Sequence, residues 1–552
     1  MDVSVMMGGS QSQLKVGIGR NDANLRDFGL GFSNFGNNDK MLSLRNRVCF
    51  SQSRNLRVSD DHAFGFTLRA AHAAGAVIPA ENVSADSSSS GASLESIDGI
   101  RVFVGLPLDV VSEGSKVNHE KAISAGLRAL KLMGVDGVEL PVWWGIAQKE
   151  AMGKYDWSGY LAVAELVQKM GLKLHASLCF HASSKPKIPL PGWVSRVGEA
   201  DPSIFFTDRS GRQFKDCLSL AVDDLPIFDG KSPIQVYHEF CQSFKSSFAG
   251  FMGSTITGIT IGLGPDGELR YPSSHLAAKP NDNPGVGEFQ CYDKYMLGQL
   301  KQHADETGNP LWGLGGPHDV PNYDQRPSVN TFFKEEGGSW ETAYGDFFLS
   351  WYSSQLIAHG NRILSHASST FRDNPVTISG KLPLAYSWYK TRSHPSELTA
   401  GFYNTANRNG YEAVVEMFAK NSCRITLPGL DLLDADQPNG SSPQSLLAQI
   451  KGTCRKHGVR VSGQNLSVSG VTAGFEEMKK NLSEDNGVVD LFMYQRMGAD
   501  FFSPKHFPLF TGFIRSLNQL DLGEDDMPQG KGAMKSIQAK LEAQASLQMQ
   551  VA

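Results

Sequence analysis

The sequence predicts an α/β protein whose core is a closed (β/α)₈ barrel with long βα loops. Strand-like and helix-like segments alternate from Ile100 onward, which is typical of a parallel sheet with right-handed crossovers. The strand candidates number eight, the number that closes this barrel. They extend over roughly 400 residues, more than the minimal barrel needs, which predicts long loop insertions. An open, doubly wound sheet is the structural alternative, because spacing alone does not separate the two.

The strand candidates are short apolar runs that end in polar or turn-forming residues. In chain order they are Ile100–Leu106, Gly137–Val142, Leu172–His181, the run 254–264 ending at Gly264, Ile378–Leu384, Cys423–Thr426, Val459–Gly463 and Val488–Tyr494. Helical spacing of apolar residues separates them. Clear cases are Ile123, Leu127 and Leu130 after the first strand, and Val163, Val167 and Met170 after the second.

Composition excludes several classes of function. Of the 552 residues, 40% are hydrophobic and 20% charged, and the net charge of −5 comes without a basic block. A nucleic-acid partner is therefore not expected, because it needs clustered Lys and Arg. No apolar run reaches the ~20 residues of a membrane helix, so no membrane association is expected. The seven cysteines are scattered without CxxC or Cys/His spacing. We expect free thiols, no metal and no cofactor.

The two ends of the chain differ from its middle. Residues 1–95 are rich in Ser, Gly, Asn and Ala with scattered arginines, and they lack an apolar signal-peptide core. This favours an organelle transit peptide followed by a linker, and hence a chloroplast (plastid stroma) location. A plain disordered extension is the alternative. Residues 96–520 form the predicted barrel domain, and residues 521–552 are a polar C-terminal tail.

The loop after the fourth strand contains a glycine-rich motif followed by a glutamate. GLGPDG (262–267) matches the glycine spacing of a dinucleotide-binding loop, but no helix follows it, so we reject a nucleotide cofactor. Glu268 comes next, at the strand end where barrel enzymes carry their chemistry. A carboxyl group held protonated near aromatic side chains would serve as a general acid. By itself, a glutamate in such a loop is more often a solvated surface residue than a general acid.

Several long segments resemble the plant β-amylases, glycoside hydrolase family 14. They are LPLDVV (106–111), GVDGVELPVWWG (134–145), YDWSGY (155–160), GLGPDGELRYPS (262–273), GEFQCYDKY (287–295), FFLSWYS (347–353) and HPSELTAGFYN (394–404). They run in order through the predicted barrel. Within the family, the best match is the group of plastid-type homologues described as inactive.

The resemblance implies an inverting exo-hydrolase that releases maltose from the non-reducing ends of α-1,4-glucans. Such enzymes use a glutamic acid that protonates the glycosidic oxygen and a glutamate base that activates water. The family's acid falls on Glu268. Its base lies in a motif close to Val-Ala-Gly-Glu-Asn, where this chain has VSGQN (461–465), so that Gln464 stands in the base position. A carboxamide does not accept a proton at cellular pH.

Other departures from the family pattern lie near the same site. Pro141 replaces an Asp that contacts the terminal sugar, and ASSKPKIPLPGWV (182–194) replaces a longer, glycine-rich lid. Tyr386 and Ser387 replace a His and a Trp, and TLPGL from Thr426 lacks the Glu of the inner loop. The family's substrate-binding positions that are retained are His181, Lys381, Thr426, Asn465 and Arg496.

The sequence thus predicts a catalytically inactive β-amylase homologue that acts as a non-catalytic or regulatory protein in starch breakdown. Its expected partners are α-1,4-glucan, bound weakly, and another starch-degrading amylase. Two alternatives stay open. One is an active β-amylase in which another group, such as Asp431 or Asp434, replaces the base. The other is a protein-interaction scaffold without a glucan ligand.

Overall fold

The computed structural model describes residues 99–274, 284–466, 472–483 and 487–518. The predicted transit peptide and linker (1–95) and the predicted C-terminal tail (521–552) lie outside these residues. Within them, eight parallel strands close into a barrel in the order β1-β12-β11-β10-β9-β8-β3-β2. The barrel prediction is therefore confirmed, and the open-sheet alternative is wrong.

Each predicted strand corresponds to a strand of the barrel. The eight are β1 (Arg101–Gly105), β2 (Gly137–Trp143), β3 (Lys173–Cys179), β8 (Ile256–Ile261), β9 (Thr377–Lys381), β10 (Arg424–Leu427), β11 (Val461–Gln464) and β12 (Val489–Tyr494). They are nearly continuous runs of buried residues, as expected for parallel strands covered on both faces.

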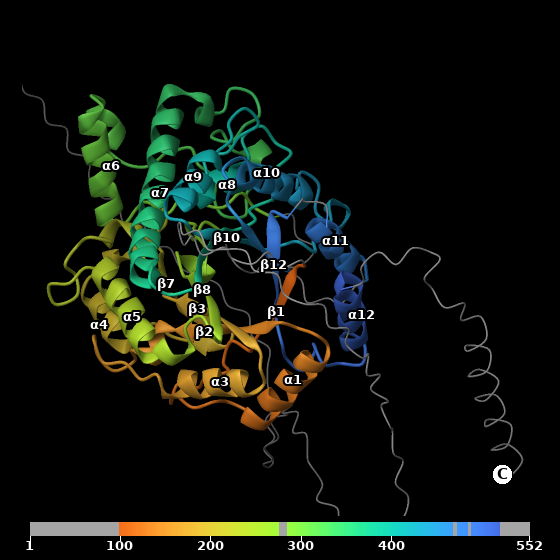
Figure 1. The fold of residues 1–552 in the computed structure, drawn as a ribbon. Coiled ribbons are helices and arrows are strands. Elements are labelled where there is room, and N and C mark those ends of the chain that lie inside the picture. The colour runs from red at the N-terminus through yellow and green to blue at the C-terminus, as the bar shows by residue number, and fades with distance from the viewer. Residues whose placement is uncertain (1–98, 275–283, 467–471, 484–486, 519–552) are drawn as a thin grey trace, which may run out of the picture. The chain divides into compact units, whose positions relative to one another are not determined.

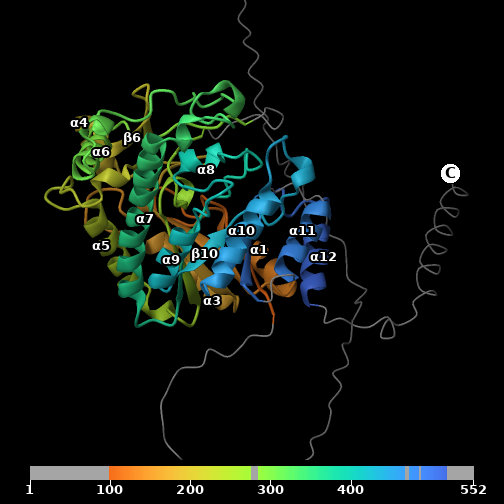
Figure 2. The ribbon, with the colours of Figure 1, turned by 90° about the horizontal axis from the view of Figure 1, so that it is seen from above.

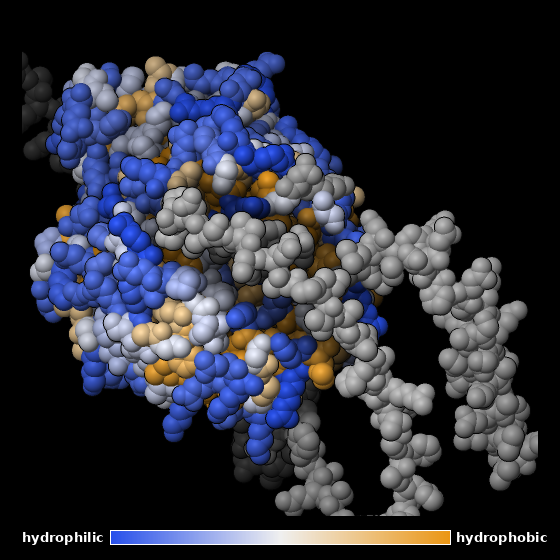
Figure 3. All heavy atoms as spheres, in the orientation of Figure 1, coloured by the Kyte–Doolittle hydropathy of each residue, from blue (hydrophilic) through white to orange (hydrophobic). Residues whose placement is uncertain are grey.

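A ring of helices surrounds the barrel (Figures 1 and 2). One main helix connects each barrel strand to the next strand along the chain. In chain order these helices are α1 (Glu120–Leu132), α3 (Ser158–Lys169), α5 (Pro233–Ser247), α7 (Ala343–Phe371), α9 (Glu412–Lys420), α10 (Pro443–Lys456) and α11 (Thr472–Ser483). The last helix, α12 (Phe507–Asn518), follows β12. The predicted apolar stripe of α1, Ile123, Leu127 and Leu130, is buried against the core. The outer face in Figure 3 is mainly hydrophilic over these helices.

The long loops carry elements of their own. These are α2 (Trp144–Ala147), the hairpin β4 (Ser183–Ser184) and β5 (Lys187–Ile188), α4 (Gly192–Ala200), the hairpin β6 (Phe205–Thr207) and β7 (Gln213–Leu218), α6 (Lys294–Glu306) and α8 (Pro395–Ala400). No helix of the described ranges combines the length and the apolar character that crossing a membrane requires.

The interior of the barrel holds both apolar and polar side chains. Phe103 of β1 and Leu491 and Met493 of β12 form a small separate apolar cluster. The polar side chains include His175, whose Nε2 lies 2.7 Å from Thr260 Oγ1, which lies 2.9 Å from Ser379 Oγ. These polar side chains support the cavity that opens at the carboxyl ends of the strands.

Candidate functional site

A cavity of about 240 Å³ opens at the carboxyl ends of the barrel strands. It lies where barrel proteins place their ligands. Its lining consists of Leu108, Glu139, Pro141, Trp143, Ser177, Leu178, Cys179, His181, Thr260, Gly262, Asp266, Gly267, Lys381, Thr426, Gln464, Gln495 and Arg496. Of the seven site residues predicted from the sequence, five are among them: His181, Lys381, Thr426, Gln464 and Arg496. Glu268 and Asn465 are not, although both contact residues of the lining.

Glu268 is brought to the site by a tight turn after β8. Asp266 and Gly267 both have positive φ angles, 54° and 77°, and reverse the chain after Leu263. The backbone then runs parallel to β9, and the main chain of Glu268 forms an isolated β-bridge with the main chain of Lys381. The Glu268 carboxylate lies 3.2 Å from Lys381 Nζ and accepts a 2.9 Å hydrogen bond from Arg270 Nε. Two cations therefore hold this carboxylate.

Burial and charge act on Glu268 in opposite directions. Burial raises the pKa of the carboxyl group, but Lys381 and Arg270 lower it further, so that the pKa lies below its ordinary value. Glu268 is therefore ionised at neutral pH, and only 13% of its side chain is exposed. The interpretations of a protonated acid and of a solvated loop residue are both wrong, because the sequence did not reveal how closely the two cations approach.

Gln464 and Thr426 form a neutral wall of the cavity. They end the neighbouring strands β11 and β10, and both are buried. Thr426 Oγ1 has no hydrogen-bond partner in the described part of the chain. Within the same residues no hydrogen bond joins the Gln464 amide to another group. Because an amide both donates and accepts, this wall offers hydrogen bonds to a polyhydroxylated ligand.

The opposite wall contains a carboxylate that sequence reasoning missed. Glu139 points inward from β2, where Ser177 Oγ donates to its Oε1 at 2.6 Å and Gln495 Nε2 donates to its Oε2. Arg496 lies 3.9 Å away. Burial raises the pKa of Glu139, but Arg496 and these hydrogen bonds bring it below its usual value. The sequence did contain a signal for Glu139. It is the one charged residue of the otherwise apolar strand GVELPVW, and it lies two positions before Pro141, so both side chains point to the same face of the strand.

Asn465 supports the site without lining it. Its Nδ2 donates to the Gln495 carbonyl at 2.8 Å, and its Oδ1 accepts from the Gln495 backbone N–H at 2.6 Å. This reciprocal pair fixes the segment that presents Gln495 and Arg496 to the cavity.

The rim near β2 and β3 is aromatic. The Trp143 indole meets the His181 ring edge to face, with ring centroids 5.2 Å apart. His181 Nδ1 lies 2.9 Å from the Ala182 carbonyl, so this nitrogen donates and Nε2 remains as the acceptor in the neutral ring. Burial lowers the pKa of His181, which favours that neutral form. Pro141 stands beyond the end of the β1 pairing and offers the cavity neither a donor nor a charge.

The segment in the place of the family's lid is fixed to the barrel. It forms the short hairpin β4–β5, and the Ala182 N–H donates to the Asp216 carbonyl at 2.7 Å. Its Pro189 carbonyl packs so closely on Gly145 that a Cβ there would lie 1.9 Å from the oxygen. Such close packing disfavours a hinged closure over the cavity.

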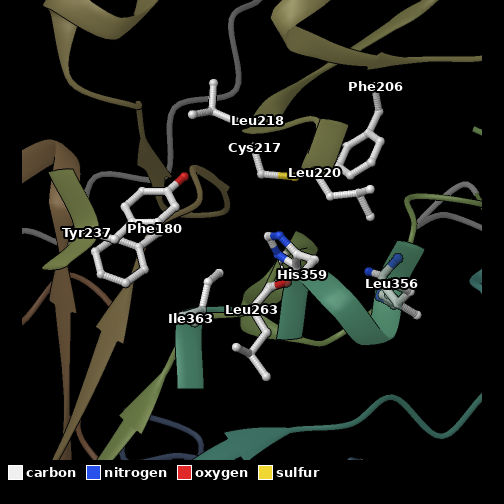
Figure 4. Close-up of a pocket in the computed structure, with 13 residues that line it drawn as sticks. Phe180, Phe206, Cys217, Leu218, Leu220, Tyr237, Leu263, Leu356, His359 and Ile363 are labelled. Carbon is white, nitrogen blue, oxygen red and sulfur yellow. Dashed lines mark hydrogen bonds between the residues drawn. The ribbon is translucent and has the colours of Figure 1, made fainter. Parts of the chain in front are cut away.

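A second, much smaller cavity lies behind the turn that carries Glu268 (Figure 4). Its volume of about 20 Å³ is room for about one water molecule. Apolar side chains such as Phe180, Leu220 and Ile363 surround it, and His359 Nε2 donates to the Leu263 carbonyl at 2.9 Å. This region braces the turn and is too small for a sugar.

The described cysteines are free and protonated. Cys179, Cys217, Cys241, Cys291, Cys423 and Cys454 form no disulfide. Burial raises the pKa of Cys179, which lines the cavity, to about 12. A thiol of this kind is a poor nucleophile, because thiolate is the reactive form.

Comparison with known proteins identifies the family. The model of glycosyl hydrolase family 14 matches residues 103–519. The chain is 61% identical over 434 residues to inactive beta-amylase 9 of Arabidopsis thaliana, covering 78% of this chain and 80% of that protein. It is 39% identical over 444 residues to beta-amylase 1, chloroplastic, of the same plant, covering 78% and 77%.

A solved structure agrees with this result. The catalytic domain of beta-amylase from Paenibacillus polymyxa superposes with a TM-score of 0.63 at 28% identity, covering 77% of this chain and 99% of that one. The predicted resemblance is thereby confirmed over the whole barrel. The chain belongs to glycosyl hydrolase family 14, the β-amylase family.

Proposed function

We propose that this chain is a non-catalytic β-amylase homologue that contacts α-1,4-glucan and modulates starch breakdown. The observation that carries the proposal is Gln464, an amide in the position that the family's motif assigns to the catalytic base. A positioned base contributes about 10²–10⁴-fold to the rate. An inverting mechanism has no covalent route that bypasses it. The name of the relative at 61% identity, inactive beta-amylase 9, supports the same conclusion.

The surroundings offer no convincing substitute for the base. Neither Asp431 nor Asp434 lines the described cavity. Asp431 accepts a hydrogen bond from the Leu466 N–H, and Asp434 accepts from Ser442 Oγ. Glu139 does line the cavity, but its lowered pKa makes it a weak base. An active hydrolase is therefore the less favoured alternative.

The same cavity supports residual glucan binding. Gln464 and Thr426 offer hydrogen-bonding groups on one wall of the cavity, and the aromatic side chain of Trp143 lines the same cavity from β2. Aromatic faces with a few oriented polar groups are typical of sugar-binding sites, because a sugar ring has an apolar face and a polar edge. The charged residues of the cavity are paired with other charged residues, Lys381 with Glu268 and Arg496 with Glu139. This pairing favours a neutral ligand.

The proposed setting is the plastid stroma, where the chain binds glucan, another amylase, or both. The chloroplastic name of the related beta-amylase 1 and the Arg- and Ser-containing composition of residues 1–95 support this location. A scaffold that ignores glucan is the competing proposal. Pull-down from chloroplast extract with and without maltodextrin separates the two, since only a glucan-dependent partner responds to the sugar.

The decisive experiment measures maltose release from soluble starch beside an active β-amylase at equal concentration. We expect turnover more than about 10²-fold below that control, in line with loss of the base. Turnover within that factor would contradict the proposal. Calorimetric titration with maltoheptaose tests the second half, and we expect weak but saturable binding. Absence of heat at millimolar sugar would remove the glucan ligand and favour the scaffold.

A further inference from the structure

The closed end of the cavity is occupied by a hydrogen-bonded group that we call the inner network: Glu139, Ser177, Gln495 and Arg496. Gln495 is its centre, since its Nε2 donates to Glu139 Oε2 while its Oε1 accepts from Arg496. Arg496 also donates to the Leu106 carbonyl. Each polar group of the network thus has a partner within the protein.

The inner network is packed against the barrel backbone. A Cβ at Gly105 would lie 2.9 Å from Gln495 Oε1 and 3.1 Å from Glu139 Oε2. These distances are shorter than ordinary carbon–oxygen contacts, so a larger residue at position 105 would displace the Gln495 amide and the Glu139 carboxylate. The network leaves no free space between itself and β1.

The two walls of the cavity therefore differ in what they offer a ligand. On the β10–β11 side, no hydrogen bond joins the side chains of Gln464 and Thr426 to another group within the part of the chain that the structure describes. On the β2 side, the inner network is satisfied internally and Pro141 adds no donor. The whole cavity has a volume of about 240 Å³.

We propose that Glu139 and Gln495 are specificity-determining residues that shorten the closed end of the cavity to one sugar unit. This inference rests on the proposed glucan contact. A family member that releases maltose must hold two units beyond the bond it cleaves. Here the hydrogen bonds and the volume that a second unit needs are taken by the inner network. The terminal hexose of a glucan binds Gln464 and Thr426, and no unit lies beyond it.

Gln495→Ala tests this inference in the full chain. Removing the amide opens volume beside Gly105 and frees Glu139 Oε2 and Arg496 for a sugar hydroxyl. Calorimetric titration compares methyl α-D-glucopyranoside, which has one unit, with maltose, which has two. We expect the affinity for maltose to rise about three- to tenfold relative to the affinity for the glucoside. An increase of this size corresponds to one or two new hydrogen bonds.

Gln302→Ala is the matched control, because it removes the same amide from an exposed position of α6 outside the cavity lining, and it should not change the ratio of the two affinities. If Gln495→Ala does not fold, as judged by its thermal transition, Gln495→Ser opens most of the same volume. An unchanged or lower ratio in the opened variant overturns the inference while glucan binding stands. Failure of the unmodified chain to bind either sugar overturns the proposed function and this inference with it.

Discussion

The Glu268 carboxylate and the Lys381 ammonium lie 3.2 Å apart across the ends of β8 and β9. The contact arises because the turn after β8 sends the backbone back along β9. It joins two residues for which the family resemblance predicts roles, Glu268 as the acid and Lys381 in sugar binding. The pair is largely buried, so removing one partner should lower the free energy of unfolding. The contribution of the pair can therefore be measured without an activity assay.

Replacing Lys381 by Met should destabilise the protein by about 1.5–3 kcal/mol at pH 7, the usual contribution of a hydrogen bond to a charged group, because Arg270 still pairs with Glu268. Glu268 has a lowered folded pKa, so its stabilising contribution is present above its unfolded pKa and is lost as the pH falls. The difference between the two proteins should therefore shrink towards pH 4. Urea unfolding at both pH values measures it.

The double variant Lys381→Met with Glu268→Gln is the control for that experiment. Because it removes both charges, it should recover most of the lost stability at pH 7. A loss below about 1 kcal/mol in the single variant, the range of an exposed pair, would show that the contact is solvated.

Gln464→Glu should restore little maltose release, although it returns a carboxylate to the base position. Pro141 still lacks the group that orients the terminal sugar, and the β4–β5 hairpin remains fixed. Chromatography of the products from soluble starch measures the effect, with Gln464→Ala as the control. Recovery to within about tenfold of an active β-amylase would show that the base alone, worth about 10²–10⁴-fold, separates this chain from the enzymes.

His175 should make the protein sensitive to mild acid. Burial lowers its pKa from 6.5 to about 4, so the folded state resists protonation that the unfolded chain accepts. Its contribution is complete above pH 6.5 and is lost as the pH falls towards 4, by about 3 kcal/mol in total. His175→Gln should flatten the pH dependence of the unfolding free energy in this window. An identical slope in both proteins would assign the acid sensitivity to other groups.

The thiol of Cys179 should be inert despite lining the cavity. With a pKa of about 12, less than about one thiol in a thousand is ionised at pH 8. Iodoacetamide at that pH should therefore leave Cys179 unmodified in the folded chain and label it fully after denaturation. Peptide mapping by mass spectrometry measures the two fractions. Rapid labelling of the folded chain would mean that the cavity stabilises the thiolate.

The local pattern of apolar and polar residues was sufficient to predict the barrel architecture. Short apolar runs such as IRVFVGL and helical spacing such as Ile123, Leu127 and Leu130 predict every barrel strand and the first helix, because burial on a barrel depends on periodicity along the chain. The family motifs likewise point to Glu268 and Gln464 from sequence. The protonation state of Glu268 was predicted wrongly, because it depends on Lys381, which is 113 positions away in the numbering.

By itself the sequence determined the barrel and the family, and it predicts an amide in the base position, since these follow from residue type and spacing. Only the tertiary structure decided how the charges pair. Glu139 and Gln495 are 356 residues apart, yet closure of the barrel brings β2 and the end of β12 together around Gly105. Electrostatic energy depends on distances of a few ångströms between atoms, and closing the sheet sets those distances.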